Sequence, residues 1–273
     1  MEVLTRKNNL LRINSTTGKV SVVRNNITMY KKTDEYTVLA TPNYLEVLSG
    51  KKLYLSLFRK VNNVHILPNP GAQTKNSVRI YLIGDRYIEY LEDTQIQSEV
   101  ETSRNINDTC IYNNIIIALQ NSKITLYSKY LKKLDEIKVS MKYCEKISII
   151  EHNGKGLVGV LSSTERRVLL IYGKEVAKDI SVSKQAKNIK IVTWKDKPMC
   201  LISEGNAVRV VSAFDEEDRI VETEHISNIT QIEYKDNTVY TISSEGIVCS
   251  FSMDETLATA IYVDAEGLES IGV

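Results

Sequence analysis

The sequence predicts an all-β protein built from a repeated hairpin unit, and three observations support this. Turn signals flanked by short apolar runs recur along all 273 residues, helical periodicity is almost absent, and two stretches are nearly alike. Residues 199–212 read MCLISEGNAVRVVS and residues 239–252 read VYTISSEGIVCSFS. Each stretch is an apolar run, a Ser-Glu-Gly turn and a second apolar run, which is the pattern of a β-hairpin.

The spacing of these hairpins predicts the architecture. Successive turn signals are separated by 41, 35, 37, 43, 41 and 41 residues, close to the length of one four-stranded propeller blade. We therefore expect residues 1–273 to form a single seven-bladed β-propeller with four antiparallel strands in each blade. The turn signals lie near Asn8, Ser49, Gly84, Asn121, Thr164, Gly205 and Gly246.

The strands of one blade follow from the last complete repeat. Runs rich in β-branched residues begin at Ile229, Thr238, Gly246 and Thr256, and polar or Gly-containing segments bound them. The two preceding repeats divide in the same way. The first two runs of each repeat are nearly continuous apolar segments, which favours burial between blades, whereas the fourth carries more charge and predicts a solvated outer edge.

The chain ends complete the pattern. Residues 1–8 match a second strand with no first strand before it, and residues 267–273 are a further apolar run without a repeat of its own. We expect the second segment to supply the inner strand of the first blade, since closing the ring removes exposed strand edges.

The third strands of the repeats end in an aromatic or aliphatic residue followed by a small polar one, as in TLYS at 125–128, LIYG at 170–173 and CSFS at 249–252. In this feature the chain resembles WD40-type β-propellers, and the resemblance implies the propeller fold. The sequence contains no Trp-Asp and no Gly-His dipeptide, and Trp194 lies on a predicted first strand. The buried Asp/His/Ser set of that family is therefore assigned to no residue here. Residues 61–77, with two prolines, predict an outer strand, an irregular loop and a new inner strand.

Composition limits the classes of function. The chain carries 35 Lys and Arg against 34 Asp and Glu, for a net charge of +1, so the whole molecule favours neither nucleic acid nor a membrane surface. The four cysteines stand alone in apolar runs, which predicts buried free thiols in a reducing compartment. With no signal peptide and no long apolar span, we expect a cytoplasmic or nuclear protein without membrane insertion.

The sequence offers no catalytic constellation. His65, His152 and His225 are each predicted on an edge or a loop without the partners of a triad, and phosphate-binding and zinc motifs are absent. Arg166-Arg167 is similar to the paired arginines of phosphoinositide-binding propellers, but Glu165 and Val168 flank it in place of an apolar residue and a Gly. We expect no enzymatic activity, no cofactor, no metal and no small-molecule substrate.

Charge separates between the two faces of the predicted ring. Turns between second and third strands share one face with the loops between blades, and turns between third and fourth strands lie on the other. The other face is expected to be acidic, through Glu92, Asp93, Glu175, Asp215, Glu216, Glu217, Asp218, Asp254 and Glu255. The first face is expected to bind partners through Arg6, Lys7, Lys51, Lys52, Arg86, Lys123, Arg166 and Arg167.

The leading functional hypothesis is a non-catalytic scaffold or adaptor subunit of a multiprotein complex, which binds other protein subunits through its faces. The alternative is a propeller that binds RNA or another phosphate-rich ligand on the basic face, as the non-catalytic partner of an RNA-modifying or RNA-processing enzyme. An acidic protein surface and RNA are the two partners that such a face would attract, and binding of RNA would weaken steeply with salt.

Overall fold

A computed structural model describes most of the chain. It omits residues 1, 6–9, 14–19, 33–35, 50–51, 59–60, 69–77, 93, 244–246, 264–267 and 273, and it describes residues 2–5, 10–13, 20–23, 32, 68, 261–263 and 268–272 by their backbone. Every regular element in the described residues is a β-strand, and these residues contain no helix long and apolar enough to cross a membrane. The all-β expectation is confirmed.

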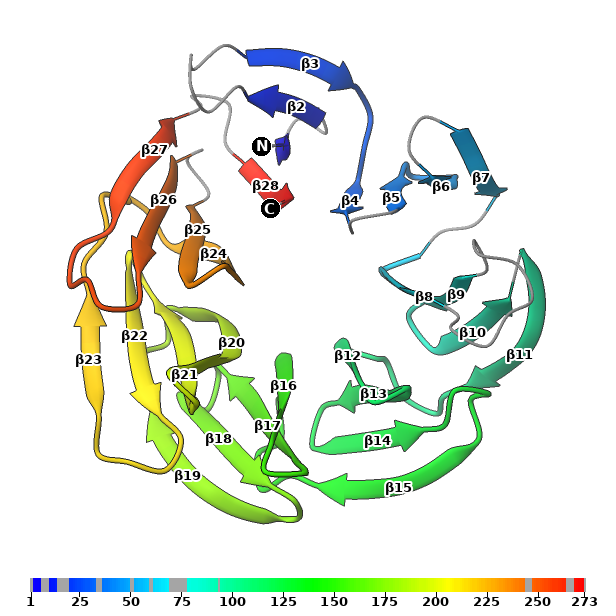
Figure 1. Ribbon diagram of the computed structural model, residues 1–273. Helices are drawn as coiled ribbons and strands as arrows, with labels where there is room; N and C mark the ends of the chain where they lie inside the picture. The colour runs from blue at the N-terminus through cyan, green and yellow to red at the C-terminus, as the bar shows by residue number, and fades with distance from the viewer. Residues whose placement is uncertain are drawn as a thin grey trace.

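The strands form four-stranded antiparallel sheets arranged around a ring (Figure 1). Six sheets are blades of four strands that are consecutive in the chain. The first three are β4 Met29–Lys32, β5 Tyr36–Ala40, β6 Leu45–Ser49 and β7 Lys52–Leu57; β8 Asn63–Pro68, β9 Val78–Ile83, β10 Tyr87–Glu92 and β11 Gln95–Glu101; and β12 Asp108–Tyr112, β13 Ile115–Gln120, β14 Lys123–Tyr127 and β15 Lys133–Lys138.

The other three blades continue around the ring and contain the longest strands. They are β16 Lys146–His152, β17 Lys155–Ser162, β18 Arg167–Tyr172 and β19 Glu175–Ser181; β20 Ala186–Trp194, β21 Lys197–Glu204, β22 Ala207–Ser212 and β23 Asp218–Val221; and β24 Ile229–Lys235, β25 Thr238–Ser243, β26 Ile247–Ser252 and β27 Thr259–Val263. The strands expected from Ile229 onward are therefore confirmed, and Trp194 ends a first strand as predicted.

The prediction of a seven-bladed propeller is wrong, because the described residues form six blades, each of four consecutive strands. The remaining sheet joins the two chain ends in the order β28-β1-β2-β3, from β1 Glu2–Thr5, β2 Leu10–Ile13, β3 Val20–Arg24 and β28 Leu268–Gly272. Its strands have only four or five residues, and register shifts interrupt the pairing at Leu4/Thr5 and Leu10/Leu11. The number of turn signals gives the number of hairpins in the chain, but it does not show which hairpins pack together as complete blades. The expected pairing of the chain ends is present between β1 and β28.

Hydrophobic cores lie between the faces of neighbouring blades. One such core combines Leu201 and Val210 from one blade with Ile232 and Phe251 from the next. All six residues of β9 are buried, whereas the outer strand β15 has no fully buried residue. Gly159 on β17 permits the closest of these contacts, because a Cβ there would lie 2.8 Å from Cδ1 of Ile189. The apolar inner and middle strands and the charged outer strand match the sequence pattern.

The second-to-third turn in the β4–β7 blade differs from the predicted one. It is the segment Thr41–Tyr44, where the amide of Thr41 donates to the carbonyl of Tyr44 over 2.7 Å. The turn near Ser49 instead joins β6 to β7, the third and fourth strands. It therefore lies on the opposite face from its predicted position.

Residues 61–77 also differ from the expectation. They contain the inner strand β8, and the outer strand of the preceding blade is β7, which ends before them. The expected irregular loop falls on residues 69–77, outside the described part of the chain.

Candidate binding surfaces

The inner strands of the blades surround a central channel with a volume of about 960 Å³ (Figure 1). Successive side chains of a strand point to opposite sides, so each inner strand presents alternate residues to this space. Polar side chains converge on the channel. Its polar lining includes Lys31, Asn63, His65, Asp108, Lys146, Ser148, Asn188, Lys190, Gln231 and Glu233.

Some of these polar side chains complete the hydrogen bonding of the neighbouring inner strand. An inner strand has a free edge, whose amide and carbonyl groups need partners. The amide of Ile191 on β20 donates to Oγ of Ser148 on β16 over 2.9 Å. The amide of Ile147 on β16 donates to Oδ2 of Asp108 on β12 over 3.1 Å. These side chains therefore connect blades that share no backbone ladder.

Two nitrogen bases in the channel have lowered pKa values. Lys31 Nζ donates to Oδ1 of Asn63 over 2.5 Å and to the carbonyl of Val64 over 3.1 Å. Burial lowers the pKa of Lys31 to about 8, against the opposing effect of nearby carboxylates. His65 Nε2 lies 2.8 Å from Oγ1 of Thr109, and burial lowers its pKa to about 3, with a further contribution from the charge of Lys31. His65 is thus neutral at pH 7, and it lies on the inner strand β8, which is an edge strand of its sheet.

The channel carries charges of both signs. Lys190 Nζ lies 2.9 Å from Oε2 of Glu233, and Gln231 donates to the other carboxylate oxygen over 3.0 Å. Lys31 and Lys146 add two cations, and Asp108 adds one carboxylate. The described lysines and carboxylates of the channel nearly balance, and several are already hydrogen-bonded, so this part of the lining favours neither cations nor anions strongly.

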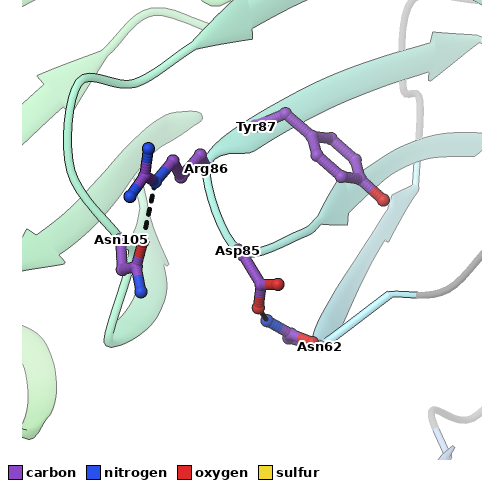
Figure 2. A pocket seen from close by; sticks show the side chains of 5 residues that line it. All are labelled: Asn62, Asp85, Arg86, Tyr87 and Asn105. Carbon is purple, nitrogen blue, oxygen red and sulfur yellow. Dashed lines mark hydrogen bonds between the residues drawn. The ribbon is translucent and has the colours of Figure 1, made fainter.

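A second cavity, of about 500 Å³, lies at a rim of the ring beside the β9–β10 turn (Figure 2). It is lined by Asn62, Asp85, Arg86, Tyr87 and Asn105. Asn62 Nδ2 donates to Oδ1 of Asp85 over 2.6 Å, and Arg86 Nε donates to Oδ1 of Asn105 over 2.9 Å. These bonds tie the turn to the loops on either side of the blade. We call this cavity the Arg86 pocket.

The wall of the Arg86 pocket depends on a glycine. A Cβ on Gly84 would lie 1.9 Å from Cε1 of Tyr87, so the ring occupies the space that any other side chain would need. The amide of Gly84 also donates to the carbonyl of Tyr87 over 3.0 Å, which closes the turn. The sequence Gly-Asp-Arg-Tyr therefore places the Tyr87 ring against the turn, with Asp85 and Arg86 exposed beside it.

In the blades from β16 to β23, the turns and loops that were predicted to share a face do so, as cross-links between them show. Ser163 Oγ, in the β17–β18 turn, donates to both carboxylate oxygens of Glu145 in the preceding loop, over 2.7 and 2.6 Å. The amide of Ser183, between β19 and β20, donates to Glu204 beside the β21–β22 turn over 2.5 Å. We call this side of the ring the turn face.

The structure brings only part of the predicted basic set together on the turn face. Arg86 and Arg166 are exposed there. Lys123 is paired with Glu136 at 3.2 Å, and Arg167 makes an ion pair with Asp179 at 2.6 Å. Lys52 lies on the opposite face, because its turn joins third and fourth strands. Arg6, Lys7 and Lys51 lie outside the described residues.

Three exposed cations on the turn face were missed by the sequence analysis, which counted hairpin turns and passed over the loops between blades. Arg104, Lys142 and Lys184 occupy three consecutive interblade loops. Within the described part of the chain, none of these three, nor Arg86 or Arg166, has a carboxylate oxygen within 4.0 Å. We call these five residues, Arg86, Arg104, Lys142, Arg166 and Lys184, the basic arc.

The opposite face pairs only part of its cations internally. Its turns carry the expected acidic residues, except Asp93, which is outside the described part. Three of its lysines pair with these or adjacent carboxylates at 2.7 to 2.9 Å, in the pairs Lys174–Asp135, Lys195–Asp254 and Lys197–Asp215. Lys129, Lys132 and Lys155 are exposed on this face without an ion pair to a described carboxylate.

Large apolar side chains are exposed beside the basic arc. Tyr44 and Phe58 are 49% and 75% exposed, and their rings contact each other edge to face with centroids 5.0 Å apart. Tyr143 and Ile226, in two other interblade loops, are also exposed. Such side chains cost solvation free energy when left in water, so they indicate a surface that gains by being covered.

His225 is buried and has partners that the sequence analysis did not find. Its Nε2 lies 2.8 Å from Oγ1 of Thr241, and its Nδ1 lies 3.8 Å from Sγ of Cys249. Burial lowers the pKa of His225 to about 4 and raises the pKa of Cys249 to about 11, so imidazole and thiol are both neutral at pH 7. His225 precedes the strand at Ile229 by four residues, and the residue before it is Glu224, so it is not part of a Gly-His dipeptide.

Other reactive groups are dispersed in the described residues. The four cysteines are free; Cys144, Cys200 and Cys249 are buried, as expected, and Cys110 is half-buried. No group of three or more His, Cys, Asp or Glu in this part of the chain is arranged to hold a metal ion.

No family model and no curated protein matches the chain. Solved structures do match it. The computationally designed Ika8 protein is similar with a TM-score of 0.66 at 11% identity, over 98% of this chain and 91% of that one. Kluyvelomyces marxianus Hsv2 gives 0.58 at 14% identity, over 87% and 80%. BBS1N, solved in complex with ARL6DN, gives 0.58 at 13% identity, over 71% and 63%. At these identities the likeness shows the β-propeller fold alone.

Proposed function

We propose that this propeller is a non-catalytic interaction scaffold that binds an acidic partner protein through its turn face. The observation that carries the proposal is the basic arc, in which five exposed cations from successive turns and loops lack carboxylate partners in the described structure. Exposed cations without ion pairs on successive turns and loops of one face favour encounter with an oppositely charged partner at that face.

A protein partner fits the turn face better than RNA does. Carboxylates of Asp85, Glu165, Glu222 and Glu224 interrupt the arc or flank it, which would repel a continuous phosphate backbone. The exposed aromatic and aliphatic side chains beside the arc are of the type that forms the buried centre of protein interfaces, where Tyr, Phe and Arg are enriched. The complex of BBS1N with ARL6DN is one case of a structural neighbour that binds another protein.

Affinity purification from the native cell, with quantitative mass spectrometry, tests the proposal. The arc variant is Arg104→Glu, Lys142→Glu and Lys184→Glu, and the matched control reverses Lys129, Lys132 and Lys155 on the opposite face. We expect the wild type and the control to retain the same stoichiometric protein partner and the arc variant to lose it. Loss of the partner on ribonuclease treatment would favour the RNA alternative. Equal retention by both variants, or no stoichiometric partner of the wild type, would refute the proposal.

A further inference from the structure

We propose that the Arg86 pocket and the Tyr44–Phe58 pair form one docking surface for an acidic peptide segment that carries a large apolar residue. The inference rests on the proposed scaffold function and assigns one part of the turn face to a defined type of ligand. Charge complementarity selects the acidic segment, and the exposed aromatic pair selects its apolar residue.

The aromatic pair and the pocket are close together because each contains a residue of the connection between β7 and β8. Phe58 follows β7, and four residues later Asn62 lines the pocket and donates to Asp85. Four residues of extended chain span at most about 14 Å. Tyr44, from the β5–β6 turn, contacts the Phe58 ring and enlarges the exposed apolar surface. A short peptide can therefore reach both.

The polar half of the surface is prepared for a carboxylate. The bond from Arg86 Nε to Asn105 fixes the guanidinium and leaves its two terminal nitrogens available for a bidentate contact, a geometry that arginine forms with carboxylates. Arg104 precedes Asn105 in the same loop and supplies a second exposed cation. Figure 2 shows Arg86 and Asn105 on one side of the pocket and the Tyr87 ring on the other.

Asp85 is the only carboxylate among the pocket residues, and its charge is partly offset. Its Oδ1 accepts the amide of Asn62 at 2.6 Å, and its carbonyl accepts the amide of Ile106 at 2.8 Å, which fixes the turn. An acidic ligand would be repelled by Asp85 and attracted by Arg86 and Arg104, so the net preference is for a single carboxylate held by Arg86. A phosphate backbone, which needs a row of cations, matches this arrangement less well.

The apolar half of the surface, Tyr44 and Phe58, offers contacts whose strength does not depend on salt concentration. Phe58 is 75% exposed and Tyr44 49% exposed, and aromatic side chains of this size dominate the energetics of protein interfaces when covered. The two halves should therefore respond differently to ionic strength. Contacts at Arg86 weaken with salt, whereas contacts at Phe58 persist.

A displayed library of random 16-residue peptides, selected on the full-length protein, tests the inference. We expect enriched peptides to combine at least one Asp or Glu with one aromatic or large aliphatic residue. In fluorescence anisotropy, Arg86→Gln and Phe58→Ser should each weaken a selected peptide at least tenfold, and only the Arg86→Gln effect should shrink at 300 mM salt. The matched controls are Lys132→Gln and Leu257→Ser on the opposite face. Circular dichroism and thermal unfolding identify any variant that fails to fold, in which case Arg86→Lys and Tyr44→Ser replace it.

Other results of the selection would contradict the docking surface alone or the scaffold proposal as well. If selected acidic peptides depend on Lys142, Arg166 and Lys184 and ignore Arg86 and Phe58, the docking surface is wrong while the scaffold proposal stands. If no peptide is enriched, or if those enriched are basic or neutral, the docking surface is also wrong. If a 16-nucleotide poly(U) RNA binds more tightly than every peptide and depends on Arg86, both the docking surface and the protein-scaffold proposal fail.

Discussion

The Nε2 atom of His225 lies 2.8 Å from Oγ1 of Thr241, inside the core of the β24–β27 blade. The loop that carries His225 joins this blade to the preceding one, and the amide of His225 also donates to Oγ1 of Thr223 within the loop over 3.1 Å. One buried imidazole therefore connects an interblade loop to the second strand of the next blade. Because the imidazole is neutral in the folded protein, its protonation opposes folding.

Acid should destabilise the protein partly through His225. Its pKa is about 4 in the folded state against an ordinary value of 6.5, so the unfolded chain binds more protons between these values. The stability contribution is complete above pH 6.5 and is lost as the pH falls towards 4, by up to about 3 kcal/mol. His225→Asn should flatten the dependence of the urea unfolding free energy on pH between 7 and 4. Parallel curves for variant and wild type would contradict this.

Alkali should stabilise the protein through Lys31. Its pKa is about 8 in the folded state against an ordinary value of 10.5, because burial disfavours the ammonium. The unfolded chain therefore holds more protons between pH 8 and 10.5, and stability rises across that window by about 1–2 kcal/mol, since channel water moderates the effect. Lys31→Met should remove the rise in urea unfolding measured at pH 7.5 to 10. The control Asn63→Ala, which keeps the lysine, should retain it.

A side chain on Gly84 should disturb the turn that builds the Arg86 pocket. Gly84→Ala places a Cβ within the Tyr87 ring and should cost about 1–3 kcal/mol of unfolding free energy, as overpacking does. Gly84→Ala combined with Tyr87→Ser should be no less stable than Tyr87→Ser alone, because the clash is then absent. Denaturant titration of the three variants measures the coupling. Additive costs would show that Tyr87 is not the obstacle.

Deletion of residues 267–273 should weaken the closure of the ring. It removes β28, which pairs with β1 and contacts the inner strand β4 and strand β25. Each lost backbone hydrogen bond costs about 0.5–1.5 kcal/mol net, against a total stability of about 5–15 kcal/mol for a protein domain. Thermal unfolding should show a clearly lower midpoint. A midpoint within about 2 °C of the intact chain would mean that the pairing contributes less than about 1 kcal/mol.

The sequence alone determined the class of fold, the strands of the blades from Lys146 to Val263, and the pairing of the chain ends. These follow from alternating apolar residues and turn residues, which act within a few positions along the chain. The sequence did not determine the face on which a turn lies, because that depends on the number of strands between successive turns. Taking the turn near Ser49 for that at Thr41–Tyr44 advanced the count by one strand and assigned Lys52 to the wrong face.

Tertiary structure decided which charges are free. Arg166 and Arg167 are neighbours in the sequence. Arg167 lies on β18 and makes an ion pair with Asp179 on the neighbouring strand β19, whereas Arg166 lies in the turn and is exposed. The same holds for His225, whose partner Thr241 is 16 residues away on another strand. Local pattern fixes which side of a strand a residue occupies. Ion pairing and burial depend on what the neighbouring strand and blade place opposite it, and only the folded ring brings those residues together.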